Sequence, residues 1–195
     1  MQPAKAFSQP VRVWVATLSD ADLALRAWLD DREIERFVRY RADTDRARFL
    51  LGAAMLRSAV GSELGMQPWR VPVHRECAVC GRWHGPPVVP DTRLALSVSH
   101  GGLLVALALA VDHAVGVDVE RVAGRHQEDV RRWTGAEARF KAGGDPGLGV
   151  RELTAPLSGH VLTLATAPDA TVQVLPSDQL LNLDGAAQPG RRFGG

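Results

Sequence analysis

The sequence feature that most constrains the fold is an unbroken apolar run at residues 103–110. A helix that spans a membrane needs about 20 apolar residues, so this run is too short to cross a bilayer. Its length and its Leu, Val and Ala content predict instead a β-strand that is buried on both faces. Strands are also predicted on either side, at residues 94–99, where apolar and small residues alternate, and at residues 114–119. Asp112 and His113 separate the last two strands, as a turn or as the seam between two halves of the fold.

Periodicity elsewhere predicts an α+β fold with mostly antiparallel strands. A helix is expected from Ser19, interpreted as its N-cap, to about Leu29. The section at residues 65–92 is rich in proline and is expected to be loop, and the tail at residues 179–195 is expected to fray. The remaining expected elements are strands at 11–16, 160–165 and 171–175, and helices at 44–64, 126–132 and 134–142.

Composition excludes several classes of function. The net charge of +1 provides no basic field for nucleic acid, and 46% hydrophobic with 23% charged residues is typical of a globular chain. Residues 1–10 hold no apolar run of the kind a signal peptide needs, so we expect a cytoplasmic protein with no membrane partner. Two cysteines, Cys77 and Cys80, are too few for a disulfide framework.

The segment Val-Gly-Val-Asp-Val-Glu at residues 115–120 offers two carboxylates on one face of a strand. Side chains alternate along a strand, so the valines face a core while Gly116, Asp118 and Glu120 face the other way. The two carboxylates lie about 7 Å apart along the strand and repel each other unless a cation lies between them. Mg²⁺ is the natural partner because it binds carboxylate and phosphate oxygens together. The alternative is an edge strand with ordinary solvated charges.

The segment Trp133-Thr-Gly-Ala-Glu-Ala-Arg-Phe-Lys141 allows two interpretations. Thr134 and Glu137 have the spacing of a capping box, and Glu137 and Lys141 have that of a surface ion pair on a helix. The functional alternative makes Glu137 a third metal ligand and Lys141 a phosphate contact.

The segment Ser97-Val-Ser-His-Gly-Gly102 ends a predicted strand with groups that suit a phosphate. Ser99 supplies a hydroxyl, His100 an imidazole, and two glycines allow a ligand to approach the backbone. A plain turn is the alternative. Upstream, residues 32–48 hold six arginines, and the second half of this stretch runs into the long predicted helix.

Cys77, Cys80 and His84 have a spacing that suggests zinc. A structural zinc site has four ligands, and only three are close in the sequence; His74 is a candidate for the fourth. The second half of a zinc-binding signature is absent.

Taken in order, these segments resemble the 4′-phosphopantetheinyl transferases that serve nonribosomal-peptide and polyketide synthases. The resemblance covers residues 32–144 and rests on the order of the motifs, above all G-V-D-V-E followed by W-T-x-x-E-A-x-x-K. It implies two similar α+β halves, a pseudo-dimer with residues 1–112 and 113–195 as its halves and the active site at their interface.

The resemblance also implies roles for individual residues. Asp118, Glu120 and Glu137 would hold Mg²⁺ and act in catalysis together with Lys141. The coenzyme A phosphates would be bound by Ser99 and His100, and its 3′-phosphate by Arg48 together with Arg32 or Arg36.

The implied reaction moves phosphopantetheine from coenzyme A, the co-substrate, to a serine of an apo acyl or peptidyl carrier protein and releases 3′,5′-ADP. The implied enzyme is a monomer.

The chain departs from the family pattern between the two hallmark motifs. Asp118 and Glu137 are 19 residues apart, and the family has a stretch roughly twice as long, with a helix that carries a candidate general base. Glu128 and Asp129 are the nearest acidic residues, and neither is assigned that role. Pro86 stands where the family often has a basic residue. Two other hypotheses stay open: a degenerate relative that binds coenzyme A, or nothing, without efficient transfer, and an unrelated structural zinc module.

Overall fold

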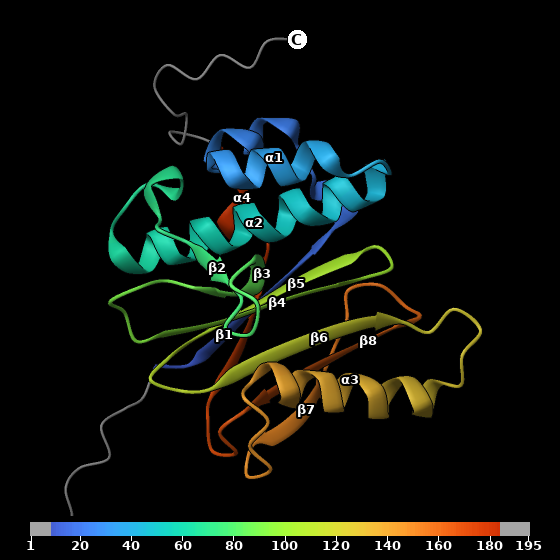
Figure 1. The fold of residues 1–195 in the computed structure, drawn as a ribbon. Coiled ribbons are helices and arrows are strands. Elements are labelled where there is room, and N and C mark those ends of the chain that lie inside the picture. Colours follow the sequence, from blue (N-terminus) through green and yellow to red (C-terminus); the bar gives the residue numbers. More distant parts are fainter. Residues whose placement is uncertain (1–8, 184–195) are drawn as a thin grey trace, which may run out of the picture.

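The computed structural model describes residues 9–183 of the chain. Helices α1 and α2 cover one face of a four-stranded sheet of order β4-β5-β1-β9, and a three-stranded sheet of order β6-β8-β7 packs beneath it with α3 alongside (Figure 1). The strands are β1 Val11–Thr17, β2 His74–Glu76, β3 Trp83–Val88, β4 Leu94–Gly101, β5 Leu104–Val111, β6 Val115–Arg121, β7 Gly149–Leu153, β8 His160–Thr166 and β9 Val172–Pro176. The α-helices are α1 Asp31–Arg39, α2 Asp43–Leu64, α3 Gln127–Lys141 and α4 Asp178–Leu181.

Strand β5 is buried on both faces, as its apolar run predicts. Val105, Leu107 and Leu109 belong to the core under α2, and the alternate positions 104, 106, 108 and 110 belong to the core shared with the three-stranded sheet. Three of those alternate positions are alanine, whose small side chains let the two sheets approach closely. The overall class, α+β, is confirmed.

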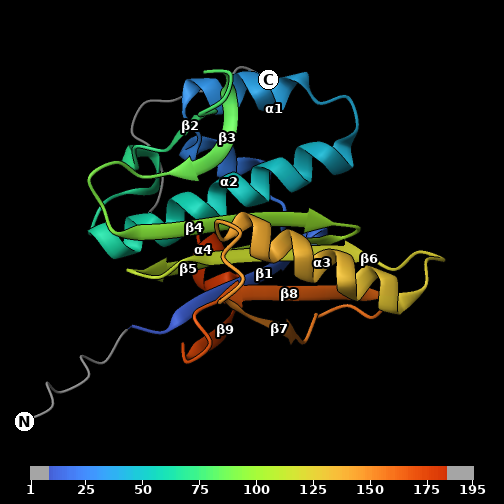
Figure 2. The ribbon, with the colours of Figure 1, turned by 60° about the horizontal axis from the view of Figure 1, so that its bottom comes forward.

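Strand β6 presents its two faces to different partners. Val115, Val117 and Val119 are buried in the core between the sheets, as the alternation predicts. Gly116 faces α3, and a Cβ there would overlap the carbonyl oxygen of Ala138. Glycine is therefore what allows α3 to lie this close to β6. Figure 2 shows the helix lying along the three-stranded sheet.

Several local predictions are wrong, each for a physical reason. The helix expected from Ser19 is two short 3₁₀ turns, Leu18–Asp20 and Leu23–Trp28, because Asp20 and Asp22 each accept backbone N–H bonds that start a new turn. The two helices expected at 126–132 and 134–142 are one helix, α3. The section expected to be loop contains the β2–β3 hairpin, and β7 was not predicted.

Strand β9 pairs in parallel with β1 in the four-stranded sheet, although it lies at the far end of the described chain. Helix α4 follows it and contacts α2. Segments from the last part of the chain thus complete the sheet built by the first part, while the expected division at residues 112 and 113 stays a prediction. The predicted tail begins within α4, and residues 184–195 lie outside the described residues.

Among the described helices, α2 is the longest, and no helix has the combined length and apolarity that a bilayer crossing requires.

Candidate functional site

Asp118 is a buried carboxylate at the contact between β4, β6 and α3. Its side chain is only 6% exposed. Its Oδ1 accepts a hydrogen bond from the Ser99 hydroxyl at 2.8 Å and from the Lys141 ammonium at 2.6 Å. Its Oδ2 is buried and has no hydrogen-bond partner among residues 9–183. A buried carboxylate oxygen without a partner is costly, so this atom is a natural place for a further positive ligand.

Lys141 reaches Asp118 from the last turn of α3. Besides Asp118, its ammonium lies 3.1 Å from Ser99 Oγ and 3.3 Å from the carbonyl oxygen of Val117. An ammonium has three donors, so these three acceptors occupy all of them. A phosphate could join Lys141 only by replacing one of them, and the longest contact, to Val117, is the weakest.

Two serines connect β4 to β6. Ser97 Oγ accepts the backbone N–H of Val117 at 3.0 Å, and Ser99 Oγ accepts that of Val119 at 3.3 Å. Side-chain hydroxyls therefore replace a backbone ladder where the two sheets meet. Ser99 at the same time donates to Asp118, so it ties the carboxylate to both strands.

Thr134 is not an N-cap, and the predicted capping box is wrong. The residue lies within α3, fully buried, and its hydroxyl bonds to the Val130 carbonyl and to the Thr163 hydroxyl on β8. Since no helix begins here, Glu137 is not needed to cap one. The alternative interpretation of Glu137 and Lys141 as a surface ion pair does not hold either, because Lys141 pairs with Asp118.

The other two expected metal ligands stand apart from this cluster. Glu120, at the end of β6, pairs with Arg125 at 2.8 Å. Glu137 forms no ion pair within the described residues. Within the described residues, the three carboxylates do not bring their oxygens within 4.8 Å of one another. The joint role of Asp118, Glu120 and Glu137 as metal ligands therefore stays a prediction.

A pocket of about 130 Å³ lies on the opposite side of β4, next to α2. His100 points into it because side chains alternate along the strand that carries Ser99. Arg36 from α1 and Arg48 from α2 line the same pocket, together with Phe49 and Tyr40, and their contact with a phosphate stays a prediction. The guanidinium of Arg48 is held by Asp45 at 2.8 Å and by the Gly102 carbonyl oxygen.

Arg75 also lines this pocket, and sequence reasoning missed it. It lies on β2, in a section that the prolines made look like loop. Its Nε is buried and has no hydrogen-bond partner in the described part of the chain, and burial lowers the pKa of the guanidinium from its ordinary value. The Nε–H group of Arg75 is therefore available to donate a hydrogen bond to an anion that enters the pocket.

His100 is surrounded by positive charge. Its pKa is lowered from the ordinary value near 6.5, first by removal from water and then by the charge of Arg48, with a smaller effect of Lys141. A phosphate would have the opposite effect, because a nearby negative charge favours the imidazolium.

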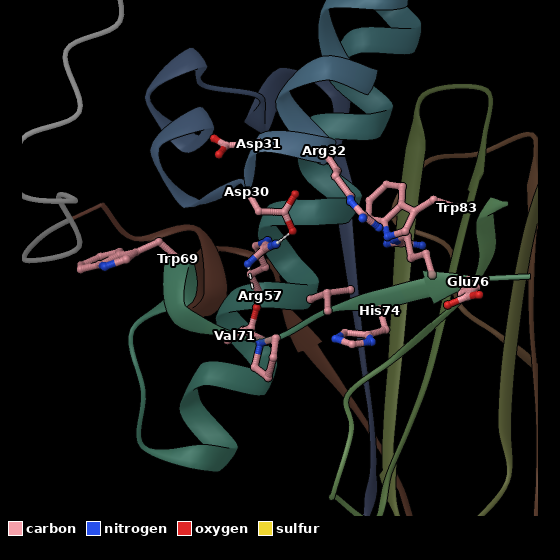
Figure 3. A pocket seen from close by; sticks show the side chains of 12 residues that line it. Asp30, Asp31, Arg32, Arg57, Trp69, Val71, His74, Glu76 and Trp83 are labelled. Atoms are coloured by element: carbon pink, nitrogen blue, oxygen red, sulfur yellow. Dashed lines mark hydrogen bonds and ion pairs between the residues drawn. The ribbon is translucent and has the colours of Figure 1, made fainter. Parts of the chain in front are cut away.

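Arg32 lies elsewhere, in a second pocket of about 510 Å³ (Figure 3). Figure 3 shows its side chain directed toward Trp83, beside the ion pair between Arg57 and Asp30. Arg57 is fully buried and also pairs with Glu33, whose pKa is raised by burial in spite of that partner. These groups join α1 to α2 and so form a structural network. Arg32 is the predicted phosphate ligand that the structure does not bring to the His100 pocket.

The comparisons with known proteins bear on the superfamily. No protein-family model matches the chain. The chain is 28% identical over 120 residues to the 4′-phosphopantetheinyl transferase HetI of Nostoc sp. (strain PCC 7120). The match covers 58% of this chain and 48% of that protein, so the chain spans about half the length of the curated relative. The similarity supports the superfamily that the motifs indicate.

Proposed function

We propose that this chain is a phosphopantetheinyl transferase that moves the phosphopantetheine group of coenzyme A to a serine of an apo carrier protein. The observation that carries the proposal is the cluster of Ser99, Asp118 and Lys141. The three residues come from three separate motifs of the resemblance, and packing of β4, β6 and α3 brings their polar atoms within hydrogen-bond distance. A chance likeness of short motifs gives no reason for such convergence.

The two sides of β4 suit two separate phosphate groups of coenzyme A, its 3′-phosphate and its pyrophosphate. Arg36, Arg48, Arg75 and His100 form a cationic pocket that suits the 3′-phosphate, because guanidinium groups bind phosphate oxygens in pairs. The Ser99, Asp118 and Lys141 cluster lies across the strand and suits the pyrophosphate. One extended ligand with phosphates at two places would use both.

The residues present fit Mg²⁺ at one point. Oδ2 of Asp118, which has no hydrogen-bond partner among the described residues, is a hard oxygen ligand of the kind that Mg²⁺ prefers. Glu120 and Glu137 are the further candidates, and Glu120 would first have to release Arg125. When bound, the ion would withdraw charge from the pyrophosphate.

In the proposed reaction the serine oxygen of the carrier protein forms a bond to the β-phosphorus, and the bond from that phosphorus to the bridging oxygen breaks. The departing 3′,5′-ADP carries the negative charge, and the serine proton is lost to a base that this chain leaves unassigned. Lys141 would counter charge on the transferring phosphoryl group. Ser99 would hold the Asp118 carboxylate in place.

The proposal is tested with the purified chain, coenzyme A, Mg²⁺ and a generic apo carrier protein, whose intact mass is then measured. We expect the carrier to gain the mass of one phosphopantetheine. Asp118→Asn should reduce the rate of carrier modification by about 10²–10³-fold, since it removes the negative charge that holds the Lys141 ammonium in place. Asp112→Asn is the matched control, because Asp112 lies in the β5–β6 turn and pairs with Arg93 at the surface.

The short connection between β6 and α3 makes this test decisive. Only residues 122–126 join the two elements, so the helix expected there from the family is absent from the described chain. A mass gain would show that transfer does not need it. If no gain occurs while coenzyme A binds and a known transferase modifies the same carrier, the transferase proposal fails in favour of a coenzyme A-binding relative without transfer activity.

A further inference from the structure

The turn of the β2–β3 hairpin brings together three side chains that the proposed reaction does not use. The Sγ atoms of Cys77 and Cys80 and a ring nitrogen of His84 all lie within 4.8 Å of one another, and Cys80 Sγ is 3.0 Å from His84 Nε2. Within residues 9–183 no other three His, Cys, Asp or Glu side chains meet this condition. We propose that these three residues form a zinc site with one open coordination position.

Backbone hydrogen bonds hold the hairpin turn in a conformation that places the Sγ atoms of Cys77 and Cys80 close together. The N–H of Gly81 donates to the Cys77 carbonyl at 2.8 Å, and the N–H of Cys77 donates to the Arg82 carbonyl at 2.8 Å. Gly81 has φ of +68°, a conformation that L side chains rarely adopt. The chain therefore turns sharply after Cys80, and His84 returns to the two thiols from the start of β3.

Cys77 and Cys80 would bind the metal as thiolates. Cys80 and His84 are exposed, so an ion reaches them from solvent without any opening of the fold.

The ligand types select the metal. Two thiolates and one imidazole are soft and borderline ligands, which suit Zn²⁺ and disfavour Mg²⁺ and Ca²⁺. His74, the fourth ligand considered from the sequence, is not part of the cluster, because it pairs with Val88 at the other end of the hairpin. A tetrahedral ion would thus keep one position for water or another small ligand.

Zinc would stabilise a hairpin that is otherwise weakly held. Only two residue pairs, His74 with Val88 and Glu76 with Trp83, join β2 to β3, and the register shifts between them. A metal that closes the turn lowers the conformational freedom of the open hairpin and so favours the ordered one. This inference does not depend on the proposed transferase activity.

The test uses the full chain, fully reduced, stripped of metal with a chelator and then titrated with Co²⁺. We expect saturation at about one Co²⁺ per chain, a thiolate-to-cobalt charge-transfer band, and the visible bands of tetrahedral Co²⁺. Added Zn²⁺ should displace the cobalt and bleach both. It should also slow tryptic cleavage after Arg82, an exposed residue in the same turn.

Three variants, Cys77→Ser, Cys80→Ser and His84→Gln, should each weaken Zn²⁺ binding by at least about 100-fold, more than loss of an outer hydrogen-bond partner costs. His74→Gln is the matched control and should bind as the wild type does. The proposal is overturned if the reduced wild type shows no charge-transfer band. It is equally overturned if the three variants, shown to be folded by circular dichroism, bind Zn²⁺ as tightly as His74→Gln.

Discussion

The ammonium of Lys141 lies 2.6 Å from Oδ1 of Asp118, although the two residues are 23 positions apart in the chain. The side chain of Asp118 is 6% exposed and that of Lys141 is 29% exposed, so this ion pair is largely shielded from solvent. It joins the last turn of α3 to the middle of β6. Lys141 thereby neutralises the charge at one carboxylate oxygen, while the other oxygen has no hydrogen-bond partner within the described residues.

Replacing Lys141 with methionine should destabilise the fold by about 3 kcal/mol, because it leaves the Asp118 charge buried without a counter-charge. The double variant Asp118→Asn with Lys141→Met should recover much of that loss, since no buried charge remains. Urea unfolding of the wild type, both single variants and the double variant completes the cycle. Equal stability of Lys141→Met and the wild type would contradict the buried ion pair.

Gly116→Ala should separate α3 from β6. The added Cβ would overlap the Ala138 carbonyl oxygen, and backbone cannot move aside cheaply. We expect a loss of about 1–3 kcal/mol from overpacking and a fall in carrier modification, since Lys141 would lose its position. The measurements are thermal unfolding and the carrier-mass assay.

Gly135→Ala serves as the control for that substitution. Gly135 lies in α3, the helix that packs on Gly116. Its added Cβ would lie 3.5 Å from Val150 Cγ1, an ordinary van der Waals distance. Alanine should stabilise this helical position by up to about 1 kcal/mol. If both alanine variants behave alike, close packing at Gly116 is not what positions the helix.

His100 should make the fold less stable as the pH falls. Its pKa in the folded chain is below the ordinary value near 6.5, so above that value the imidazole is neutral in both states and its contribution to stability is complete. Below the ordinary pKa the unfolded chain binds a proton that the folded chain does not yet bind. The contribution of the neutral His100 to the free energy of unfolding is therefore lost as the pH falls toward and through the lowered pKa. His100→Asn does not titrate, so between about pH 7.5 and 5.5 its free energy of unfolding should fall less than that of the wild type. Parallel pH curves for the two proteins would disprove the assignment.

Arg75→Ala should weaken binding of coenzyme A by about 10–100-fold, the range of a lost charge-assisted hydrogen bond. Binding of 3′-dephospho-coenzyme A should hardly change, because the proposed contact is to the 3′-phosphate. Arg32→Ala is the matched control, since Arg75 lines both pockets whereas Arg32 lines only the pocket of about 510 Å³. Calorimetric titration with both ligands separates the cases: equal losses for both ligands would place the 3′-phosphate elsewhere.

Elements with a strong local apolar pattern were the most predictable part of the fold. The apolar run at residues 103–110 and the alternation around it are local patterns, and β4, β5 and β6 begin and end within two residues of the predicted bounds. Helix α2 was predicted to within one residue for the same reason. By contrast, β7 and the β2–β3 hairpin have weak or proline-interrupted patterns, and pairing with neighbouring strands determines them.

The candidate site was predictable in part. The face of β6 that carries Asp118 followed from the two-residue period, and the burial of Val115, Val117 and Val119 confirms it. The contact between Lys141 and Asp118 was not predicted, because spacing along one helix offers only Glu137 as a partner, while tertiary packing offers the buried Asp118. Arg75 was missed, and Arg32 was assigned to a phosphate although it lies in a different pocket from His100.

The sequence by itself thus determined which side chains share a face, since the periods of strand and helix depend only on local backbone geometry. It also determined the order of the motifs, from which the resemblance follows. Only the tertiary structure decided which charges meet. The contacts of Asp118 with Ser99 and Lys141, and of Arg36 and Arg75 with one pocket, join residues far apart in the chain. Such contacts depend on how sheets and helices stack to bury their apolar faces, which no local pattern records.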